Sequence, residues 1–499
     1  MTRIHLSIMQ PPGYVHSQGF LDQARYARYQ FRRLGAEVSI GKNRLRSDAV
    51  NIIFGAHLGF QDLLKDRYTC IFFNLEQLGH GGAQVSQSYI DLLTSSEVID
   101  YDFGNLDVYN GRARSTPIVR FLFAPYLANE RPLAIPERPI DLLFFGSLND
   151  RRLKLIERVE ACGWNVARFD HPLYGAERDQ FILQAKAIFN CHFYESSRFE
   201  QARVFHSLSL GTPVISERRM QTTPPEEFED SVSWFTEEEL ERFFNEKFMT
   251  SAWQCLASQQ LARFANTDPL PFWTSAYDHA RRFAACSSER KKSTRVWRPT
   301  QMNLGAGKDY KTGWFNVDIL PQAEPDAILN LAQHQTWPIK IEDPSTGRIE
   351  LSESCLEFIY ANNVLEHVPD LPTLMGNCLT LLREGGRMTV EVPYERASSA
   401  WQDPTHVRAM NENSWVYYEG WFWYLGWFKY RFQVEELVFL DRNLTVCNKD
   451  TAHFMRVTLS KQATTLKERT IARTMQANFG GLPDDLEVTA PIRSESSIC

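Results

Sequence analysis

Residues 301–307 read QMNLGAG, a short apolar run that breaks into a turn with glycines at positions 305 and 307. Three more apolar runs follow, namely LEFIYANN (356–363), RMTVEVPY (387–394) and, before both, FNVDI (315–319). Strands that alternate with helices along a chain predict a parallel, Rossmann-like sheet. Because ligands of such sheets bind beyond the carboxyl ends of the strands, we expect a site where these runs end.

The same alternation of strand-like and helix-like segments occurs in two earlier blocks. One opens with a strand-like run at residues 4–9, and the other opens near Pro139 with IDLLFFGSLNDRR (140–152). At 499 residues, the chain is a little over three times the ~150 residues of one typical domain. We therefore expect an α/β protein of three Rossmann-like units. The predicted domains are residues 1–135, 136–286 and 301–461, with a basic linker at 287–300 and a polar tail at 462–499.

Composition excludes several classes of protein. The formal net charge of −7 argues against general nucleic-acid binding, which depends on neutralising phosphates. Nine scattered cysteines form no C-x-x-C pair, so we expect free thiols in a reducing compartment. No run resembles a signal peptide or a transmembrane helix, which predicts a cytoplasmic protein. The linker carries clustered cations that would allow peripheral contact with the inner face of a membrane: Arg290, Lys291, Lys292, Arg295 and Arg298.

The third block has the features of a ligand-binding edge. Glycines after the first strand let the backbone approach a ligand closely, and Asp318 ends the next strand, where a carboxylate can bind two ribose hydroxyls. Together with NNVLEHV (362–368) and LREGGRMTVEVP (382–393), these motifs closely resemble class I S-adenosylmethionine-dependent methyltransferases of the small-molecule and sugar-modifying branch. The resemblance implies that S-adenosylmethionine is bound by Gly305, Ala306, Gly307, Asp318, Asn330 and Asn362.

Two features depart from that family's pattern. Asn303 stands where an acidic residue is more usual, and only residues 308–317 separate Gly307 from Asp318. So short a connection cannot hold a full crossover helix. We therefore expect the first helix of this block to be shortened or lost.

Methyl transfer is an in-line displacement in which positioning contributes most, and a hydroxyl acceptor also benefits from a general base. His406 and His367 are the candidate catalytic residues, because neutral imidazole is available near pH 7. Tyr394, Asp403 and Arg408 are candidates for binding acceptor hydroxyls or a phosphate. Downstream, residues 415–432 (WVYYEGWFWYLGWFKYRF) are unusually aromatic and have three interpretations: a packed lid, a sugar-stacking cleft or an interfacial contact.

The second block suggests a nucleotide-sugar site. FGSLNDRR (145–152) places a strand end beside arginines at a helix start, which suits a diphosphate. With YGAERD (174–179), FEQAR (199–203) and GTPVIS (211–216), it resembles the nucleotide-binding half of GT-B glycosyltransferases. NLEQL (74–78) and YDFGN (101–105) resemble the N-terminal half of the same group. The resemblance implies nucleotide-sugar contacts at Gly146, Ser147, Arg151, Arg152, Glu200 and Arg203, with Glu76 as an acceptor-side candidate.

This block also departs from its family. The usual glutamates of the donor site fall at Arg198 and His206, which leaves the ribose and sugar contacts open. GT-B enzymes generally work without a bound metal, and we expect none here.

The sequence predicts a bifunctional enzyme of glycan assembly. Its first half would transfer a sugar from a nucleotide-sugar donor, and its second half would methylate a saccharide, most simply at oxygen. The expected acceptor is a saccharide or a lipid-linked saccharide. One alternative is an active methyltransferase whose GT-B half is a degenerate saccharide-binding module. Another is a membrane-docked scaffold of glycan machinery.

Overall fold

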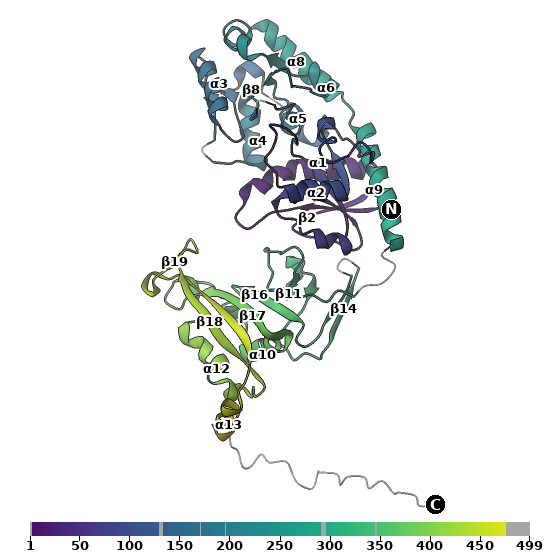
Figure 1. Ribbon diagram of the computed structural model, residues 1–499. Coiled ribbons are helices and arrows are strands. Elements are labelled where there is room, and N and C mark those ends of the chain that lie inside the picture. The colour runs from purple at the N-terminus through teal and green to yellow at the C-terminus, as the bar shows by residue number, and fades with distance from the viewer. Residues whose placement is uncertain are drawn as a thin grey trace, which may run out of the picture. The chain divides into compact units, whose positions relative to one another are not determined.

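The computed structural model describes residues 2–128, 133–169, 171–194, 196–290, 296–344 and 347–475. The chain divides into two compact units, one of Met1–Arg295 with Asp343–Gly347 and one of Val296–Glu342 with Arg348–Cys499 (Figure 1). The first unit contains two parallel sheets, and the second contains one large mixed sheet. The fold class predicted from the sequence, an α/β protein with three Rossmann-like sheets, is confirmed.

The first sheet has five parallel strands in the order β2-β1-β3-β4-β5. These strands are β1 (Arg3–Ile8), β2 (Glu37–Lys42), β3 (Val50–Phe54), β4 (Thr69–Asn74) and β5 (Glu97–Asp100). Every residue of β3 is buried, as is usual for a parallel strand that is covered on both faces. Helices α1 (Phe20–Arg33) and α2 (Gln87–Ser95) lie between the strands in sequence.

The second sheet also has five parallel strands, in the order β10-β9-β8-β6-β7. They are β6 (Ile140–Leu143), β7 (Val166–Ala167), β8 (Ala185–Asn190), β9 (Val214–Glu217) and β10 (Ser233–Phe235). The helices of this part are α3 (Asp150–Ala161), α4 (Gly175–Gln184), α5 (Gln201–Ser209), α6 (Glu226–Glu229), α7 (Leu240–Arg242), α8 (Ser251–Ala265) and α9 (Leu270–Arg290).

One hydrophobic core joins the two sheets of the first unit. It runs from Ile4 and Phe73 of the first sheet to Leu143 and Ile188 of the second. Trp273 of α9 is fully buried in it and donates its indole N–H to the carbonyl of Arg120 at 3.0 Å. Because the same helix packs against α1 and β4, the last helix of this unit returns to the first sheet.

The second unit is built on an eight-stranded sheet in the order β13-β12-β11-β16-β17-β20-β18-β19. Its strands are β11 (Gln301–Leu304), β12 (Phe315–Asp318), β13 (Ala327–Ile328), β16 (Leu356–Asn362), β17 (Leu382–Pro393), β18 (Tyr430–Leu440), β19 (Val446–Cys447) and β20 (Phe454–Ala463). Pairing is parallel from β13 to β17, whereas β20 runs antiparallel to both β17 and β18. A separate two-stranded sheet holds β14 (Ile339–Asp343) and β15 (Gly347–Leu351), and the helices are α10 (Leu371–Leu381), α11 (Ser399–Gln402), α12 (Val416–Glu419) and α13 (Leu466–Met475).

The connection between β11 and β12 lacks a helix, which confirms the prediction from its length. Residues 305–314, all described, form turns and irregular backbone. Asn303, the departure from the family pattern, holds this connection in place. Its side-chain amide donates to the carbonyl of Asp309 at 2.8 Å and to Asn316 Oδ1 at 3.1 Å.

Two segments that we expected to be irregular are partly regular. Helix α9 continues to Arg290, through the first residues of the predicted linker. At the other end of the linker, Trp297 forms a bridge to Ile349, while Lys291, Lys292 and Arg295 lie outside the described residues. In the predicted tail, α13 forms an amphipathic helix. Its residue Glu468 forms an ion pair of 2.9 Å with Arg431 of β18. Residues 476–499 lie outside the described part.

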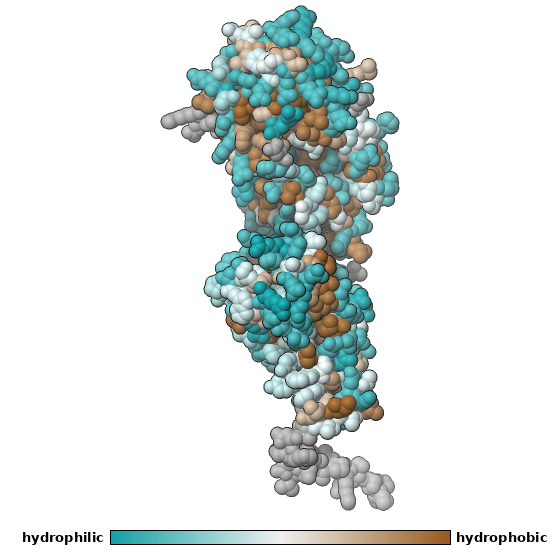
Figure 2. Space-filling model, turned by 90° about the vertical axis from the view of Figure 1, so that its left-hand side faces the viewer, coloured by the Kyte–Doolittle hydropathy of each residue, from teal (hydrophilic) through white to brown (hydrophobic). Residues whose placement is uncertain are grey.

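The aromatic segment is half packed and half exposed. Trp415, Tyr418 and Phe422 are buried against the core of the second unit, whereas Trp421 and Tyr424 are exposed. Among the described residues, no helix is both long enough and apolar enough to cross a bilayer. On the face drawn in Figure 2, hydrophobic side chains gather into bands between hydrophilic ones. The eight cysteines that the structure describes are free, as predicted.

Candidate functional site

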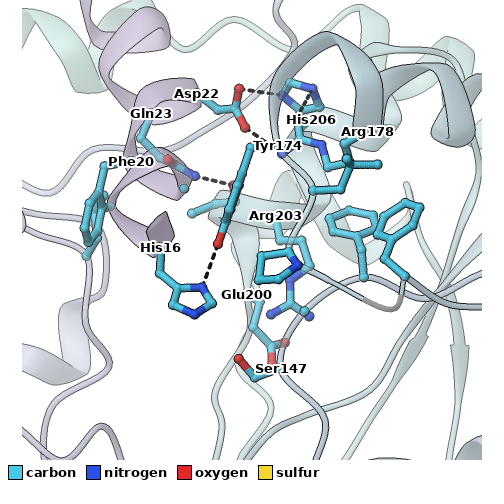
Figure 3. A pocket seen from close by; sticks show the side chains of 18 of the residues that line it. His16, Phe20, Asp22, Gln23, Ser147, Tyr174, Arg178, Glu200, Arg203 and His206 are labelled. Atoms are coloured by element: carbon cyan, nitrogen blue, oxygen red, sulfur yellow. Dashed lines mark hydrogen bonds and ion pairs between the residues drawn. The ribbon is translucent and has the colours of Figure 1, made fainter. Parts of the chain in front are cut away.

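The first unit holds a cavity of about 860 Å³, a volume typical of small-molecule sites. Residues from both parallel sheets line it, including the loop after β6, the start of α4 and the start of α5 on one side and α1 on the other (Figure 3). The ends of parallel strands and the N-termini of helices meet there, which is the usual place for a ligand in an α/β fold. The cavity is therefore the candidate nucleotide-sugar site.

Five of the predicted residues line this cavity: Gly146, Ser147, Glu200, Arg203 and Glu76. Gly146 has a positive φ of 132°, and a Cβ at this position would lie only 3.2 Å from Arg203 Nη2. The glycine thus gives the guanidinium room beside the loop after β6. The structure brings these side chains together, and their role in binding stays a prediction.

Glu200 is a carboxylate of the cavity wall with cationic side chains close to it. His192 Nδ1 lies 3.0 Å from Glu200 Oε2, and Arg152 Nη2 lies 3.8 Å from Oε1. Burial raises the pKa of a carboxyl, but the hydrogen bond and charge of His192 and the charges of Arg203 and Arg152 together lower the pKa of Glu200 to about 2. Glu200 is therefore ionised at neutral pH and can accept hydrogen bonds from hydroxyl groups.

Arg151 and Arg152, which we expected to bind the diphosphate, do not line the cavity. The Arg151 guanidinium forms an ion pair with the fully buried Glu217 and donates to the carbonyl of His192. Arg152 is only 1% exposed, and it donates to the carbonyls of Cys191 and Ser147 at 3.0 and 2.7 Å. Asn149 of the same motif caps α3, since its side chain accepts a hydrogen bond from the Arg152 N–H at 2.9 Å. These contacts hold the loop of FGSLNDRR in shape, and the binding of a diphosphate by the two arginines stays a prediction.

The cavity wall also contains a cluster of buried polar side chains that we did not predict from the sequence. Arg178 Nη1 donates to Asp22 Oδ2 at 2.7 Å, and Arg178 Nη2 lies 2.8 Å from His206 Nε2 (Figure 3). Asp179 Oδ1 lies 2.8 Å from the same His206 nitrogen. The YGAERD motif contained the signal for Arg178 and Asp179, but Asp22 lies 156 residues away from Arg178 in the chain. His206, which stands where the family has a glutamate, is thus held among charged side chains at the cavity wall.

The motifs of the N-terminal half have mainly structural partners. Asn74 of NLEQL and Asn105 of YDFGN each donate a hydrogen bond of 2.9 Å to the buried Asp100. Burial raises the pKa of Asp100 to about 6, although these hydrogen bonds oppose the shift. Glu76, the acceptor-side candidate, lies 3.6 Å from His57, whose pKa is lowered by burial.

In the second unit, the predicted cofactor residues gather at one edge of the sheet. The strand order reverses direction at β11, whose neighbours are β12 and β16, and a ligand crevice opens at such a reversal. Gly305 and Gly307 follow β11 with φ angles of 67° and 47°, Asp318 ends β12, and Asn362 ends β16 with its side chain exposed. Asp318 Oδ2 accepts the N–H of Gly307 at 2.8 Å, which closes the turn onto the carboxylate.

The glycine turn packs tightly against the segment after β16. A Cβ on Gly305 would lie 2.3 Å from Val364 Cγ2, so only glycine fits between this turn and the segment after β16. Ala306 is buried and donates its N–H to the carbonyl of Val317 at 2.9 Å. Asn330 follows Leu329, whose N–H bonds the carbonyl of Asp318 at 3.1 Å, so it lies at the same edge.

The two candidate catalytic histidines lie together. The rings of His367 and His406 meet edge to face with centroids 4.7 Å apart. Glu366, which we had not singled out, is 2% exposed beside them, and burial raises its pKa to about 7. The LEHV motif contained Glu366, but its burial depends on the loop that carries His406, 40 residues later.

The three residues that we expected to bind an acceptor have different surroundings. Asp403 lies at this cluster, because its Oδ1 accepts the hydroxyl of Thr405, which in turn contacts His367 Nδ1 at 2.9 Å. Arg408 Nη2 donates to the carbonyls of Val368 and Pro369 at 2.6 and 2.7 Å, which fixes it against the backbone. Tyr394 is completely buried, and its hydroxyl donates to Glu412. The core of the unit encloses the Tyr394 ring, and the expected contact of its hydroxyl with an acceptor stays a prediction.

A family model described as a methyltransferase domain matches residues 306–434, from the glycine turn into β18. The C-terminal half therefore contains a methyltransferase domain, as its motifs indicated. One curated relative, an uncharacterized protein of Acanthamoeba polyphaga mimivirus, is 24% identical over 166 residues. The alignment covers 32% of this chain and 51% of the relative, so the chain spans about half the length of the curated relative that it matches.

Similar solved structures include glycosyltransferases and methyltransferases. AviGT4, a glycosyltransferase involved in avilamycin A biosynthesis, is 13% identical over 57% of this chain and 99% of its own, with a TM-score of 0.35. WaaG, a glycosyltransferase involved in lipopolysaccharide biosynthesis, is 13% identical over 56% and 99%, with a TM-score of 0.37. A putative type 11 methyltransferase from Sulfolobus solfataricus is 15% identical over 36% and 94%, with a TM-score of 0.22. Scores this low assign no activity to this chain.

Proposed function

We propose that this chain is a bifunctional transferase of glycan assembly. Its second unit transfers a methyl group from S-adenosylmethionine to a saccharide oxygen, and its first unit transfers a sugar from a nucleotide-sugar donor. The observation that carries the proposal is the edge formed by Gly305, Gly307 and Asp318, at the start of a segment (306–434) that matches a methyltransferase domain. The proposed acceptor is a saccharide or a lipid-linked saccharide, which would place the protein at the inner face of a membrane.

Each residue of the methyl-donor edge has a distinct part in this proposal. When bound, S-adenosylmethionine supplies an electrophilic methyl group. The Asp318 carboxylate accepts hydrogen bonds from the ribose hydroxyls, and the glycine turn allows the backbone to lie against the cofactor. His406 and His367 assist loss of the acceptor proton, either directly or through an ion that they bind.

The cavity of the first unit is the proposed donor site for sugar transfer. Glu200 would bind ribose hydroxyls, while Arg203 and the N-terminus of α5 would face the diphosphate. These positive groups would stabilise the charge that develops on the leaving diphosphate, in place of a metal. The cavity is large enough for a nucleotide sugar.

A second candidate function is methyl transfer alone, with the first unit serving to bind a saccharide. His206 favours it, because it replaces a donor-site glutamate and is held by Arg178 and Asp179 at the cavity wall. The contact between Glu200 and His192 favours the first proposal, in which the first unit transfers a sugar.

One experiment separates these functions. The full chain is incubated with a panel of nucleotide sugars, isotopically labelled S-adenosylmethionine and saccharide acceptors, and products are identified by mass spectrometry. We expect products that carry both the added sugar and the label. Label without added sugar would support the second candidate, and absence of label from every acceptor would contradict the proposal for the second unit.

A further inference from the structure

Glu366, His367 and His406 form a compact group of metal-binding side chains at the methyl-donor edge. Glu366 and His367 lie in a short 3-10 turn (Leu365–His367) that follows β16, and His406 lies in the loop after α11. One potential ligand atom from each residue lies within 4.8 Å of the other two. In the part of the chain that the structure describes, this is the one such group of three.

The carboxylate of Glu366 lacks the partners that a buried charge needs. The residue is 2% exposed, and both of its carboxylate oxygens are buried without a hydrogen-bond partner. A buried carboxylate of this kind is costly unless a cation or a donor faces it. Arg408, the neighbouring cation, directs its Nη2 to backbone carbonyls instead.

Each imidazole uses its Nδ1 in a hydrogen bond, which leaves Nε2 as the nitrogen for an ion, and Asp403 Oδ2 lies 3.9 Å from His406 Nε2. His406 Nδ1 lies 2.9 Å from the carbonyl of Ala400, so this nitrogen must carry the hydrogen. His367 Nδ1 faces the hydroxyl of Thr405 at 2.9 Å and its carbonyl at 3.3 Å, and that hydroxyl donates its own hydrogen to Asp403 at 2.6 Å. Metal-binding histidines commonly donate their other N–H to a carbonyl or a carboxylate in this manner.

Backbone contacts hold the two segments of the group together. The N–H of Val407, next to His406, donates to the carbonyl of Glu366 at 2.9 Å. Asp403 Oδ1 accepts the Thr405 N–H at 2.8 Å, which fixes the loop that carries His406. The group is therefore arranged by the fold and does not depend on chance proximity of surface side chains.

We propose that Glu366, His367 and His406 bind one divalent transition-metal ion, of which Zn²⁺ is the type. Two imidazole nitrogens and one carboxylate oxygen suit Zn²⁺, Co²⁺, Mn²⁺ or Fe²⁺, whereas Mg²⁺ and Ca²⁺ prefer oxygen ligands alone. Around tetrahedral zinc, the ligand atoms lie about 3.3 Å apart. In this structure the three ligand atoms lie within 4.8 Å of one another, so binding of the ion would draw them closer together.

Three protein ligands leave a fourth position open for another molecule. For the role of the ion, this inference rests on the proposed methyl transfer. A hydroxyl group that binds a divalent cation loses its proton to solvent more readily, because the ion stabilises the resulting oxygen anion. The open position would thus take a saccharide hydroxyl at the edge where the methyl donor lies.

Metal binding by the full chain tests the site directly. The protein is stripped with a chelator and titrated with Co²⁺, whose visible d–d absorption reports its coordination. We expect one equivalent of Co²⁺ to bind with a tetrahedral-type spectrum and to be displaced by Zn²⁺. His406→Ala and the nearly isosteric Glu366→Gln should each weaken binding at least tenfold, whereas His334→Ala, an exposed histidine of the same unit, should bind as the wild type does.

The outcomes separate the ion site from methyl transfer. Affinity for S-adenosylmethionine is measured by calorimetry on the same samples, and circular dichroism verifies that each variant is folded. The inference is overturned if the wild type gives no Co²⁺ spectrum, or if both variants keep the wild-type spectrum and affinity. If the metal site fails this test but S-adenosylmethionine still binds, the proposed function stands without the metal site. If Co²⁺ binds but S-adenosylmethionine does not, the metal site stands and the proposed methyl transfer is contradicted.

Discussion

The carboxylate of Asp318 lies where two backbone N–H groups reach it. Gly307 and Leu320 donate to its two oxygens at 2.8 and 2.9 Å, and each oxygen keeps a lone pair for a ribose hydroxyl. We expect Asp318→Ala to weaken binding of S-adenosylmethionine at least tenfold, as measured by calorimetry. Glu357→Ala removes an exposed carboxylate from the opposite end of β16 and should leave the affinity unchanged. Equal affinities of the two variants would place the ribose site elsewhere.

Glu200 makes the stability of the first unit depend on pH. Its pKa is lowered to about 2 from a usual value of 4.5, so the ionised form stabilises the fold fully above pH 4.5 and loses that effect as pH falls toward 2. We expect Glu200→Gln to lower the unfolding free energy on the order of 3 kcal/mol at pH 7, since each unit of pKa shift corresponds to about 1.4 kcal/mol.

Urea denaturation at several pH values checks this prediction. The difference between wild type and Glu200→Gln should shrink below pH 4.5, because the wild-type carboxylate is then gaining its proton. Glu226→Gln changes an exposed carboxylate at the start of α6 and should match the wild type throughout. A difference that stays constant with pH would mean that the charge of Glu200 is not responsible.

At the scale of elements, Gly305 determines how closely β11 and the segment after β16 approach. The glycine has a positive φ, and an added Cβ would lie 2.3 Å from Val364 Cγ2. Gly305→Ala should therefore lower the melting temperature of the second unit by several degrees and weaken cofactor binding. Gly307→Ala also has a positive φ but meets nothing nearer than 4.0 Å, so its effect should be smaller.

A double variant separates the clash from the backbone strain. Val364→Ala removes the methyl group that the new Cβ would meet, so Gly305→Ala/Val364→Ala should recover part of the lost stability. Thermal unfolding followed by tryptophan fluorescence measures the effect. Losses that simply add in the double variant would show that strain at φ, and not the contact with Val364, governs this turn.

The elements that followed from the sequence are those with local signals. The motif QMNLGAG predicted the buried strand β11 and its glycine turn. The short connection of ten residues before Asp318 predicted that the helix between β11 and β12 is missing. Helix α13 was missed because its composition is polar and its order depends on Arg431, a residue of a distant strand.

Side-chain roles were less predictable than strand positions. Arg152 and Tyr394 were expected at ligand sites, but both are enclosed by segments that are remote in sequence. The same cause hid the contact between Asp22 and Arg178, which joins two sheets. Burial and ion pairing result from the tertiary fold, so a motif gives the residue types of a site more reliably than their exposure.

At the scale of the whole molecule, each unit has its own hydrophobic core. The first unit has three buried clusters, one of which joins its two sheets, and a separate cluster packs on the eight-stranded sheet of the second. Scanning calorimetry of the full chain should therefore show two transitions. S-adenosylmethionine should raise the melting temperature of only one transition, and a nucleoside diphosphate that of only the other. At a ligand concentration of a hundred times Kd, each ligand should add about 2.7 kcal/mol to the unfolding free energy of the unit that binds it.

The Asp318→Ala variant provides the control for this experiment. It should lose the shift caused by S-adenosylmethionine and keep the shift caused by the nucleoside diphosphate. A single transition that both ligands raise together would contradict the assignment of one site to each unit.

The order of strands in the second unit also bears on how the protein is made. Among the strands that the structure describes, β18 lies between β20 and β19 in the sheet, and β20 comes last in the chain. During synthesis, β18 therefore leaves the ribosome before β20, its neighbour in the sheet, has been made. Until β20 is made, the edge of β17 that pairs with it is also exposed. The two parallel sheets of the first unit and helix α9 are complete by residue 290 and can fold in this interval. We expect nascent chains stalled before residue 454 to expose this edge and to require chaperones, while their N-terminal part is already resistant to protease.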